Sequence, residues 1–388
     1  MTWPLADRGR PIALAAAFAV MGVAGGQWLG GGWALERSDL ALAVPTLLVF
    51  ALVYGKLSAL LGVPARRVIG LGAAAAGVAA LVSMATASTP WADTLTFLAA
   101  TLAALLVAAG LRSLLNGRPL WLALPVLALA AGLWWLSGHV GLARLYGPNP
   151  QAASGRTILL TGLPLRQWAR AGQADYADDP ALTALGQQLA RPVVLQDALA
   201  ANMLAPSDRL LLAHPLALSP ATLVEVDRFV RRGGRAVILA DGLSGWPPPY
   251  RFGDPRNPPV TSLLTPLLDH WGLTLAAPAP DGPAAGAVGV RDGGQRLALH
   301  SPGYFAAVPG TCRTSAIVAG QGPSVATCRI GAGTAVLLAD ADLLYAPLWQ
   351  PQPAWAAHLR PADNIAWVAA QLNGPDAGPA WGLRPTWR

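Results

Sequence analysis

Five apolar stretches fill most of the first 137 residues of this chain, and they constrain its architecture more than any other feature. Each is close to the roughly 20 residues that a helix needs to cross the hydrocarbon layer of a bilayer, which is roughly 30 Å thick. The stretches are Pro11–Gly31, Leu40–Leu61, Val68–Thr86, Leu95–Leu111 and Leu120–Leu136. The sequence therefore predicts an α-helical membrane bundle of about five transmembrane helices over residues 1–138.

Basic residues fall in alternate connections between these stretches, which predicts the orientation of the chain. Those that precede the first stretch or lie around the second-to-third and fourth-to-fifth connections are Arg8, Arg10, Lys56, Arg66, Arg67, Arg112 and Arg118. By the positive-inside rule these segments are cytoplasmic, and an odd number of crossings places the rest of the chain on the other side. We therefore expect a bacterial inner-membrane protein with a cytoplasmic N-terminus and a periplasmic C-terminal domain. A cleaved signal peptide is the alternative for the first stretch, which its length and the four further stretches disfavour.

The net charge of +7 is concentrated in the membrane half of the chain. Residues 1–150 hold nine Arg and Lys against four Asp and Glu, whereas the remainder is nearly neutral. Basic loops of a membrane region attract anionic lipid, so membrane lipid is a predicted partner and nucleic acid is not. Gly22, Gly26 and Gly30 allow close approach between helices, which predicts a membrane-protein partner for the Gly-rich stretches. No Asp, Glu, Arg or His lies within the predicted hydrocarbon core, so translocation by this chain alone is not expected.

Residues 139–154 form a linker, residues 155–374 are predicted to form one extracytoplasmic domain, and residues 375–388 form a Pro- and Trp-containing tail. Apolar strands are predicted at 156–161, 192–195, 209–213, 235–240, 296–300, 324–330 and 334–339, and helices at 180–190, 220–232, 261–271 and 363–372. Ser219-Pro220 is a typical helix start, and Gly233-Gly234 a typical helix end. Continuous apolar strands separated by amphipathic helices predict an α/β domain with a largely parallel, doubly wound sheet.

Several segments and residues of this domain follow one pattern: Asp208–Pro215, Ser219–Phe229, Arg231–Asp241, Gly331–Asp342, Asn364 and Trp367. The pattern is a strand ending near His-Pro, a helix leading into Gly-Gly, a strand ending in Asp, a closing Asp-x-Asp, and then Asn and Trp on a helix. It resembles the ABC-transporter auxiliary, gliding-motility (GldG-like) domains, whose fold is similar to that of class I glutamine amidotransferases. The resemblance implies a non-catalytic accessory domain in an ABC-type transport system. Because the chain has no nucleotide-binding motif, an ATPase and a permease would be separate subunits.

No catalytic residue is predicted. An amidotransferase needs a nucleophilic Cys on a strand-to-helix elbow, whereas Asp241-Gly-Leu-Ser-Gly245 follows the strand at 235–240. The alternative function is a membrane-anchored extracytoplasmic hydrolase with an amidotransferase-like fold, in which Ser244 acts with His214 or His270. The two hypotheses differ in one observable, because the hydrolase requires Ser244 Oγ to lie within hydrogen-bond reach of a histidine.

Cys312 and Cys328 lie in the strand-and-turn region, and outside the cytoplasm such a pair favours a disulfide. Two buried free thiols, or one reactive Cys, remain as alternatives. The five histidines are scattered without ligand spacing, and two Cys do not complete a zinc set. The sequence therefore predicts neither a metal site nor a cofactor.

Ligands of open α/β sheets bind beyond the carboxyl ends of the strands. Residues at three predicted strand ends, together with two arginines of the Pro-rich segment 242–259, form the candidate ligand or partner groove: His214, Asp241, Asp340, Asp342, Arg251 and Arg256. The alternative is structural, because acidic residues just past a strand commonly cap helices or fix loops.

Overall fold

The computed structural model describes residues 35–49, 51–52, 77, 91–115, 120–148, 154–168, 176–251, 253–310, 312–374 and 383–387. The chain divides into two compact units. Unit 1 comprises Met1–Gly147, Pro351–Arg360 and Gly382–Arg388, and unit 2 comprises Pro148–Gln350 and Pro361–Trp381. The segment 351–360 thus groups with unit 1, although the sequence predicted it as part of the second domain.

Unit 1 contains two long apolar helices among its described residues. Its elements are η2 (Leu40–Ala43), α5 (Trp91–Leu115), α6 (Leu120–Leu145) and η4 (Ala357–Leu359). Only Trp91–Gly110 and Leu124–Leu145 are long and apolar enough to cross a membrane within the part of the chain that the structure describes. The prediction of a five-helix membrane bundle is therefore wrong for this structure. The first predicted stretch lies outside the described residues, and so does the third apart from Gly77.

The second predicted stretch shows why apolar length misled the prediction. Its described part includes a short apolar helix, Leu40–Val49, which begins as η2. The Asp93 carboxylate accepts hydrogen bonds from the backbone N–H groups of Leu40 and Ala41, each at 2.7 Å. Leu40 is buried in one cluster with Phe97 of α5. A run of apolar residues indicates that their side chains are removed from water. It does not show whether lipid or a protein core surrounds them.

A buried polar cluster completes unit 1. His139 Nδ1 lies 2.8 Å from His358 Nε2, and both side chains are buried. Arg37 donates a hydrogen bond to the carbonyl of His358 and forms a buried ion pair with Asp39. The guanidinium of Arg37 also lies over the ring of Tyr146. Burial, followed by the proximity of His139 and Arg37, lowers the pKa of His358 to about 3.

This pKa shift makes unit 1 sensitive to acid. The unfolded imidazole has a pKa of about 6.5 and takes up a proton at a higher pH than folded His358 does. Stability is therefore expected to fall as the pH drops from about 6.5 toward 3, by at most about 1.4 kcal/mol per pH unit. Thermal unfolding of the full chain at pH 7.5 and 5.0 checks this, and His358→Gln should reduce the loss. The control is His270→Gln, because His270 is an exposed histidine of unit 2; equal pH dependence in both variants would contradict the prediction.

Unit 2 is built on a seven-stranded sheet with the order β11-β12-β13-β6-β5-β1-β4. The strands are β1 (Thr157–Thr161), β4 (Val193–Leu195), β5 (Arg209–Ala213), β6 (Arg235–Leu239), β11 (Cys312–Ser315), β12 (Val325–Ile330) and β13 (Gly333–Leu338). The five strands from β13 to β4 pair in parallel, as predicted for this domain. The sheet as a whole is mixed, because the two residues between β12 and β13 make that pair an antiparallel hairpin, and β11 pairs antiparallel with β12.

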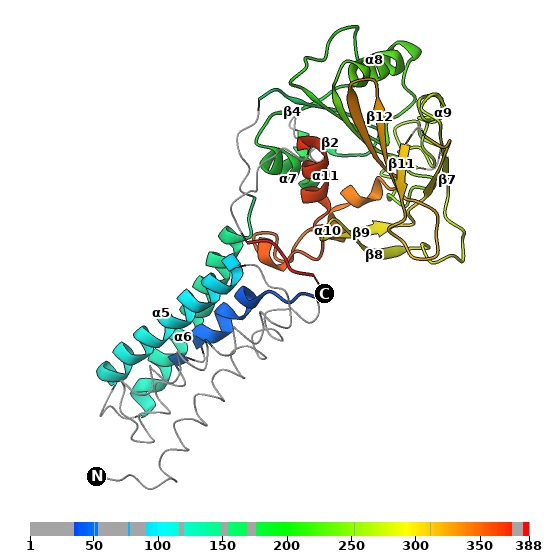
Figure 1. Cartoon of the computed structure of the whole chain (residues 1–388). Coiled ribbons are helices and arrows are strands. Elements are labelled where there is room, and N and C mark those ends of the chain that lie inside the picture. The colour runs from blue at the N-terminus through cyan, green and yellow to red at the C-terminus, as the bar shows by residue number, and fades with distance from the viewer. Residues whose placement is uncertain are drawn as a thin grey trace. The chain divides into compact units, whose positions relative to one another are not determined.

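Helices cover both faces of this sheet. They are α7 (Pro180–Leu189), α8 (Pro220–Arg231), α9 (Thr265–His270) and α11 (Asn364–Asn373). Alternate strand residues enter separate cores: Leu159 packs in the cluster that includes side chains of α7 and α11, and Ile158 in the cluster that includes those of α8 and α9. Figure 1 shows α7 and α11 side by side. The predicted start of α8 is confirmed, because the Ser219 side chain accepts a hydrogen bond from Thr222 N.

The remaining elements of unit 2 are short. They are β2 (Arg166–Trp168), β3 (Tyr176–Asp178), β7 (Leu273–Ala276), β8 (Ala287–Asp292), β9 (Gln295–His300), β10 (Tyr304–Ala307), η3 (Asp342–Leu344) and α10 (Ala346–Trp349). The strands form the antiparallel pairs β2–β3, β7–β10 and β8–β9. The helical segments η3 and α10 follow β13 in the chain. The helix predicted over 261–271 is shorter in the structure, because α9 begins only at Thr265 with proline in its first turn.

Candidate functional site

The sheet brings four of the six predicted groove residues to one edge. Strands β5, β6 and β13 are parallel neighbours in register, so the residues that follow them emerge together. His214 follows β5, Asp241 follows β6, and Asp340 and Asp342 follow β13. The three aspartates each offer a carboxylate oxygen, and these oxygens lie within 4.8 Å of one another. We call the three aspartates the acidic cluster; all three are buried.

His214 is held beside this cluster in a left-handed backbone conformation, with φ of 46°. Its N–H donates to the carbonyl of Leu239 at 2.8 Å, which fixes the turn after β5. The ring Nε2 lies 2.7 Å from the carbonyl of Pro259, and Nδ1 accepts a bond from Asp241 N at 3.3 Å. These contacts suit the neutral tautomer that carries its proton on Nε2. Burial lowers the pKa of His214, which also favours the neutral ring.

Asp241 is fully buried at the centre of the site. Its Oδ1 accepts a hydrogen bond from Ala341 N at 3.0 Å. Its Oδ2 has no hydrogen-bond partner among the described residues and lies 3.8 Å from His214 Nδ1. Burial, followed by the charge of Asp342, raises the pKa of Asp241 well above its usual value.

Asp340 and Asp342 each fix the backbone around them. Asp340 accepts bonds from His300 N at 2.8 Å and from Leu343 N at 3.0 Å. Asp342 accepts from Ser244 Oγ at 3.2 Å and from Gly245 N at 2.5 Å. Burial raises the pKa of both carboxyl groups. Both residues therefore make the loop-fixing contacts that the structural alternative predicts.

The structure adds two residues that the sequence did not single out. His300 ends β9, and its Nδ1 lies 3.7 Å from Asp342 Oδ2, with the side chain 40% exposed. Gly245 packs between them: a Cβ there would lie 2.1 Å from His300 Nδ1 and 3.0 Å from Asp342 Oδ2. Only glycine fits this approach without displacing the ring. The place of His300 at the end of a predicted strand was the one signal available for it.

The two predicted arginines do not join the cluster. Arg256 binds Asp254 of its own loop, with 2.7 Å between Nη2 and Oδ2, and its guanidinium lies 3.9 Å from the centroid of the Tyr250 ring. The Arg251 carbonyl accepts a bond from Asn257 in the same loop. Within the described part of the chain neither arginine contacts the edge residues. The guanidinium of Arg256 pairs within the Pro-rich loop instead.

Ser244 lacks the partner that a hydrolase would need. Its Oγ donates to Asp342 and accepts a bond from Trp246 N at 3.3 Å. All five histidines are described, and none hydrogen-bonds to Ser244 Oγ. His270 instead lies 3.6 Å from Asp227, measured between Nε2 and Oδ1. Within the described residues this serine therefore has a carboxylate partner but no hydrogen-bonded histidine.

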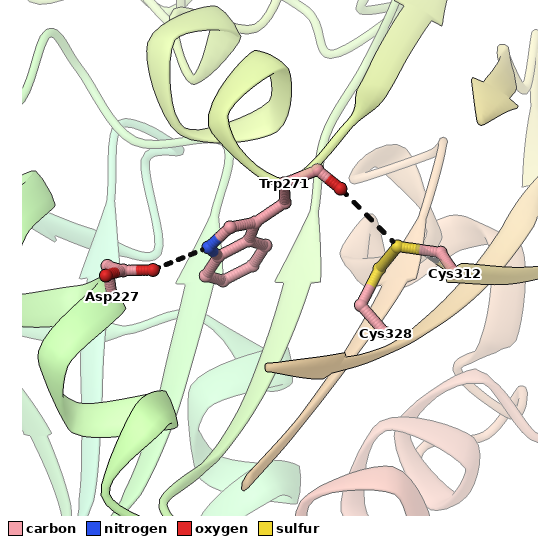
Figure 2. Close-up of a disulfide and its surroundings, with 4 residues drawn as sticks. All are labelled: Asp227, Trp271, Cys312 and Cys328. Carbon is pink, nitrogen blue, oxygen red and sulfur yellow. Dashed lines mark hydrogen bonds between the residues drawn. A yellow bond between two sulfur atoms is a disulfide. The ribbon is translucent and has the colours of Figure 1, made fainter. Parts of the chain in front are cut away.

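The predicted disulfide between Cys312 and Cys328 is confirmed. The two residues lie directly opposite each other on β11 and β12. Figure 2 shows Cys312 Sγ beside the carbonyl of Trp271, at 3.8 Å. Trp271 Nε1 in turn donates to Asp227 Oδ1 on α8 at 2.9 Å. The disulfide on edge strand β11 therefore contacts Trp271, the residue that follows α9. The indole of Trp271 in turn connects this contact to α8 through Asp227.

No protein-family model and no curated protein matches this sequence. Among solved structures, an exo-β-1,4-mannosidase from Opitutaceae bacterium strain TAV5 is 15% identical with a TM-score of 0.35, covering 63% of this chain. The chain spans only 39% of that protein's length. A ThuA-like protein from Parabacteroides merdae ATCC 43184 is 14% identical with a TM-score of 0.25, covering 61% of this chain and 98% of its own. TM-scores this low carry no argument about function.

Proposed function

We propose that this chain is a non-catalytic accessory membrane protein whose α/β unit lies outside the cytoplasm and binds a partner or ligand at the carboxyl edge of its sheet. The observation that carries the proposal is the convergence of His214 and the acidic cluster at that edge without a histidine-paired nucleophile. Ligand sites of open α/β sheets lie at this edge. The site has the side chains for binding and lacks a serine activated for attack.

Two features support a place at the membrane. Helices α5 and α6 carry large exposed apolar side chains along their length: Leu95, Leu102, Leu106, Leu124, Leu129 and Leu133. Such surfaces are costly in water and stable in lipid. The Cys312–Cys328 disulfide supports an oxidising compartment for unit 2, which in a bacterium is the periplasm. Lipid contact through α5 and α6, with unit 2 on the periplasmic side of the inner membrane, fits both features.

Exposed apolar side chains also support a protein partner at the edge. Ser244 N donates to the carbonyl of Val260, and Ser262 N donates to the carbonyl of Asp241, so these two segments lie side by side. Leu243 and Val260, on these segments, are exposed. Apolar groups beside a polar site are typical of protein interfaces. A membrane permease and a separate ATPase of an ABC-type system are the partners that the GldG-like resemblance implies.

Topology reporters test the proposed placement. Alkaline phosphatase fused at the C-terminus should be active, and a green fluorescent protein at the same position dark, because unit 2 is proposed to lie outside the cytoplasm. The matched control places both reporters at Arg118, in the basic connection between α5 and α6, where the pattern should invert. A fluorescent C-terminal fusion with an inactive phosphatase fusion would refute the proposal.

Site-specific photo-cross-linking in intact cells tests the proposed binding edge. A photoreactive residue at Leu243 should give one defined adduct with a membrane protein. The control position is Val224, which is also apolar and exposed but lies on α8. Identical adducts at both positions, or none at Leu243, would contradict binding at the carboxyl edge.

A further inference from the structure

One oxygen of the acidic cluster differs from the others in its hydrogen bonding. Both oxygens of Asp340 and both of Asp342 accept a bond from a backbone N–H or a hydroxyl. Asp241 Oδ2 accepts none among the described residues, and the Asp241 side chain is fully buried. A buried polar atom without a partner is costly, so its persistence points to a partner other than a protein donor.

The charge around this oxygen indicates what that partner is. Three carboxylates meet in a buried volume, and like charges at such distances repel strongly. In the described part of the chain no arginine or lysine forms an ion pair with any of the three. His214 faces the cluster as the neutral ring, and the imidazole of His300 meets Asp342 only at 3.7 Å. The acidic cluster therefore lacks a positive charge close to its carboxylate oxygens.

We propose that Asp241, Asp340 and Asp342 bind one divalent cation of the oxygen-preferring class, with calcium as the best fit. Calcium binds oxygens at about 2.3–2.6 Å, so two oxygens that share one ion lie no more than about 5 Å apart. The oxygens of the acidic cluster meet this condition. Magnesium usually keeps several waters and is bound through one or two carboxylates, whereas this cluster is buried and offers three. Calcium also accepts hydroxyl and water oxygens, and Ser244 Oγ lies beside Asp342.

Such a cation would join separate parts of unit 2. Asp241 follows β6, whereas Asp340 and Asp342 follow β13, and Asp342 also holds the turn at Ser244 and Gly245. Bound calcium would therefore fix the edge at which the proposed partner binds. The cation site does not depend on the accessory role, since either can hold without the other.

Thermal unfolding with and without calcium tests the site. The purified full chain in detergent is compared in EDTA and in about 5 mM CaCl2, a concentration that saturates sites of the extracellular type. Calcium should raise the Tm of the wild type and raise that of Asp241→Asn by clearly less. Calorimetric titration should show a Kd at least about tenfold weaker for Asp241→Asn. The amide has the shape of the carboxylate and removes one repelling charge, so this variant should fold in EDTA.

The matched control is Asp254→Asn, which removes a partly exposed carboxylate of the same unit that pairs with Arg256. It should keep the full calcium response. The proposal is overturned if calcium leaves the wild-type Tm unchanged, or if Asp241→Asn responds as strongly as the wild type. Should Asp241→Asn fail to fold, an anomalous difference map of wild-type crystals soaked in Mn²⁺ decides. A peak at the acidic cluster supports the site, and its absence there refutes it.

Discussion

Replacing Asn364 by leucine is expected to lower the free energy of unfolding of unit 2 by about 4 kcal/mol. Asn364 is fully buried at the start of α11. Its Oδ1 accepts from Ala298 N at 2.9 Å, and its Nδ2 donates to the carbonyls of Ala298 and Leu343 at 2.8 and 2.7 Å. Leucine has a similar size and no polar atoms, so two partly buried backbone groups of Ala298 and the buried carbonyl of Leu343 would lose their partners.

The arrangement explains why the effect should be large. The amide of Asn364 pairs with the edge of β9 as another strand would, and Asp363 N extends the pairing by donating to the carbonyl of Arg296 at 2.7 Å. The bond to Leu343 holds η3, which carries Asp342 of the acidic cluster. One side chain therefore connects α11, the β8–β9 hairpin and the candidate site.

Guanidinium-induced unfolding of the full chain, followed by tryptophan fluorescence, measures this effect. Asn257→Leu is the control, because Asn257 makes comparable side-chain bonds to the backbone of Tyr250 and Arg251 in an exposed loop. Water can replace those bonds, so the control should lose less than about 1 kcal/mol. A loss of similar size in both variants would show that burial of the amide does not set the cost.

The double substitution Cys312→Ala and Cys328→Ala is expected to lower the free energy of unfolding by about 3 kcal/mol. The disulfide closes a loop with a sequence separation of 16 residues, and a cross-link of this length restricts the unfolded chain. It also pins β11, the edge strand of the sheet, to β12. Without the bond, the ladder with β12 and the packing of residue 312 against the core remain to hold this edge.

Denaturant unfolding in the absence and presence of dithiothreitol measures the contribution of the disulfide. Reduction should move the unfolding midpoint of the wild type to that of the double variant, and should leave the double variant unchanged. Trp271 lies at this bond, because its carbonyl contacts Cys312 Sγ and its indole binds Asp227 (Figure 2). Equal stability of wild type and variant without reductant would contradict the prediction.

Local signals predicted most elements of unit 2. The Ser219-Pro220 start of α8 and the continuous apolar strands β5, β6 and β13 lie close to where the sequence placed them. Their boundaries depend on hydrogen bonds and turn residues a few positions away. The antiparallel edge of the sheet was missed, because the direction of β11 and β12 follows from hairpin geometry.

The candidate site divides in the same way. His214, Asp241 and Asp340 were predicted to meet because parallel strands end at one edge. Arg256 pairs with Asp254 in its own loop, and neither Arg251 nor Arg256 forms a hydrogen bond or ion pair with the edge residues in the described part of the chain. The sequence placed His300 only at a strand end and gave no signal for Gly245, because their contacts with Asp342 join segments far apart in the chain.

By itself, the sequence predicted which residues leave water, where parallel strands end and that a disulfide between Cys312 and Cys328 is favoured. Those properties follow from side-chain chemistry and short-range geometry. Only the tertiary structure decided which groups replace water around these residues. Leu40 lies in a protein core, and the buried, unpartnered oxygen of Asp241 belongs to a cluster of three carboxylates among the described residues. The residue type predicts whether leaving water lowers the free energy, as for apolar side chains, or raises it, as for acidic ones. Which groups then surround these side chains depends on long-range packing.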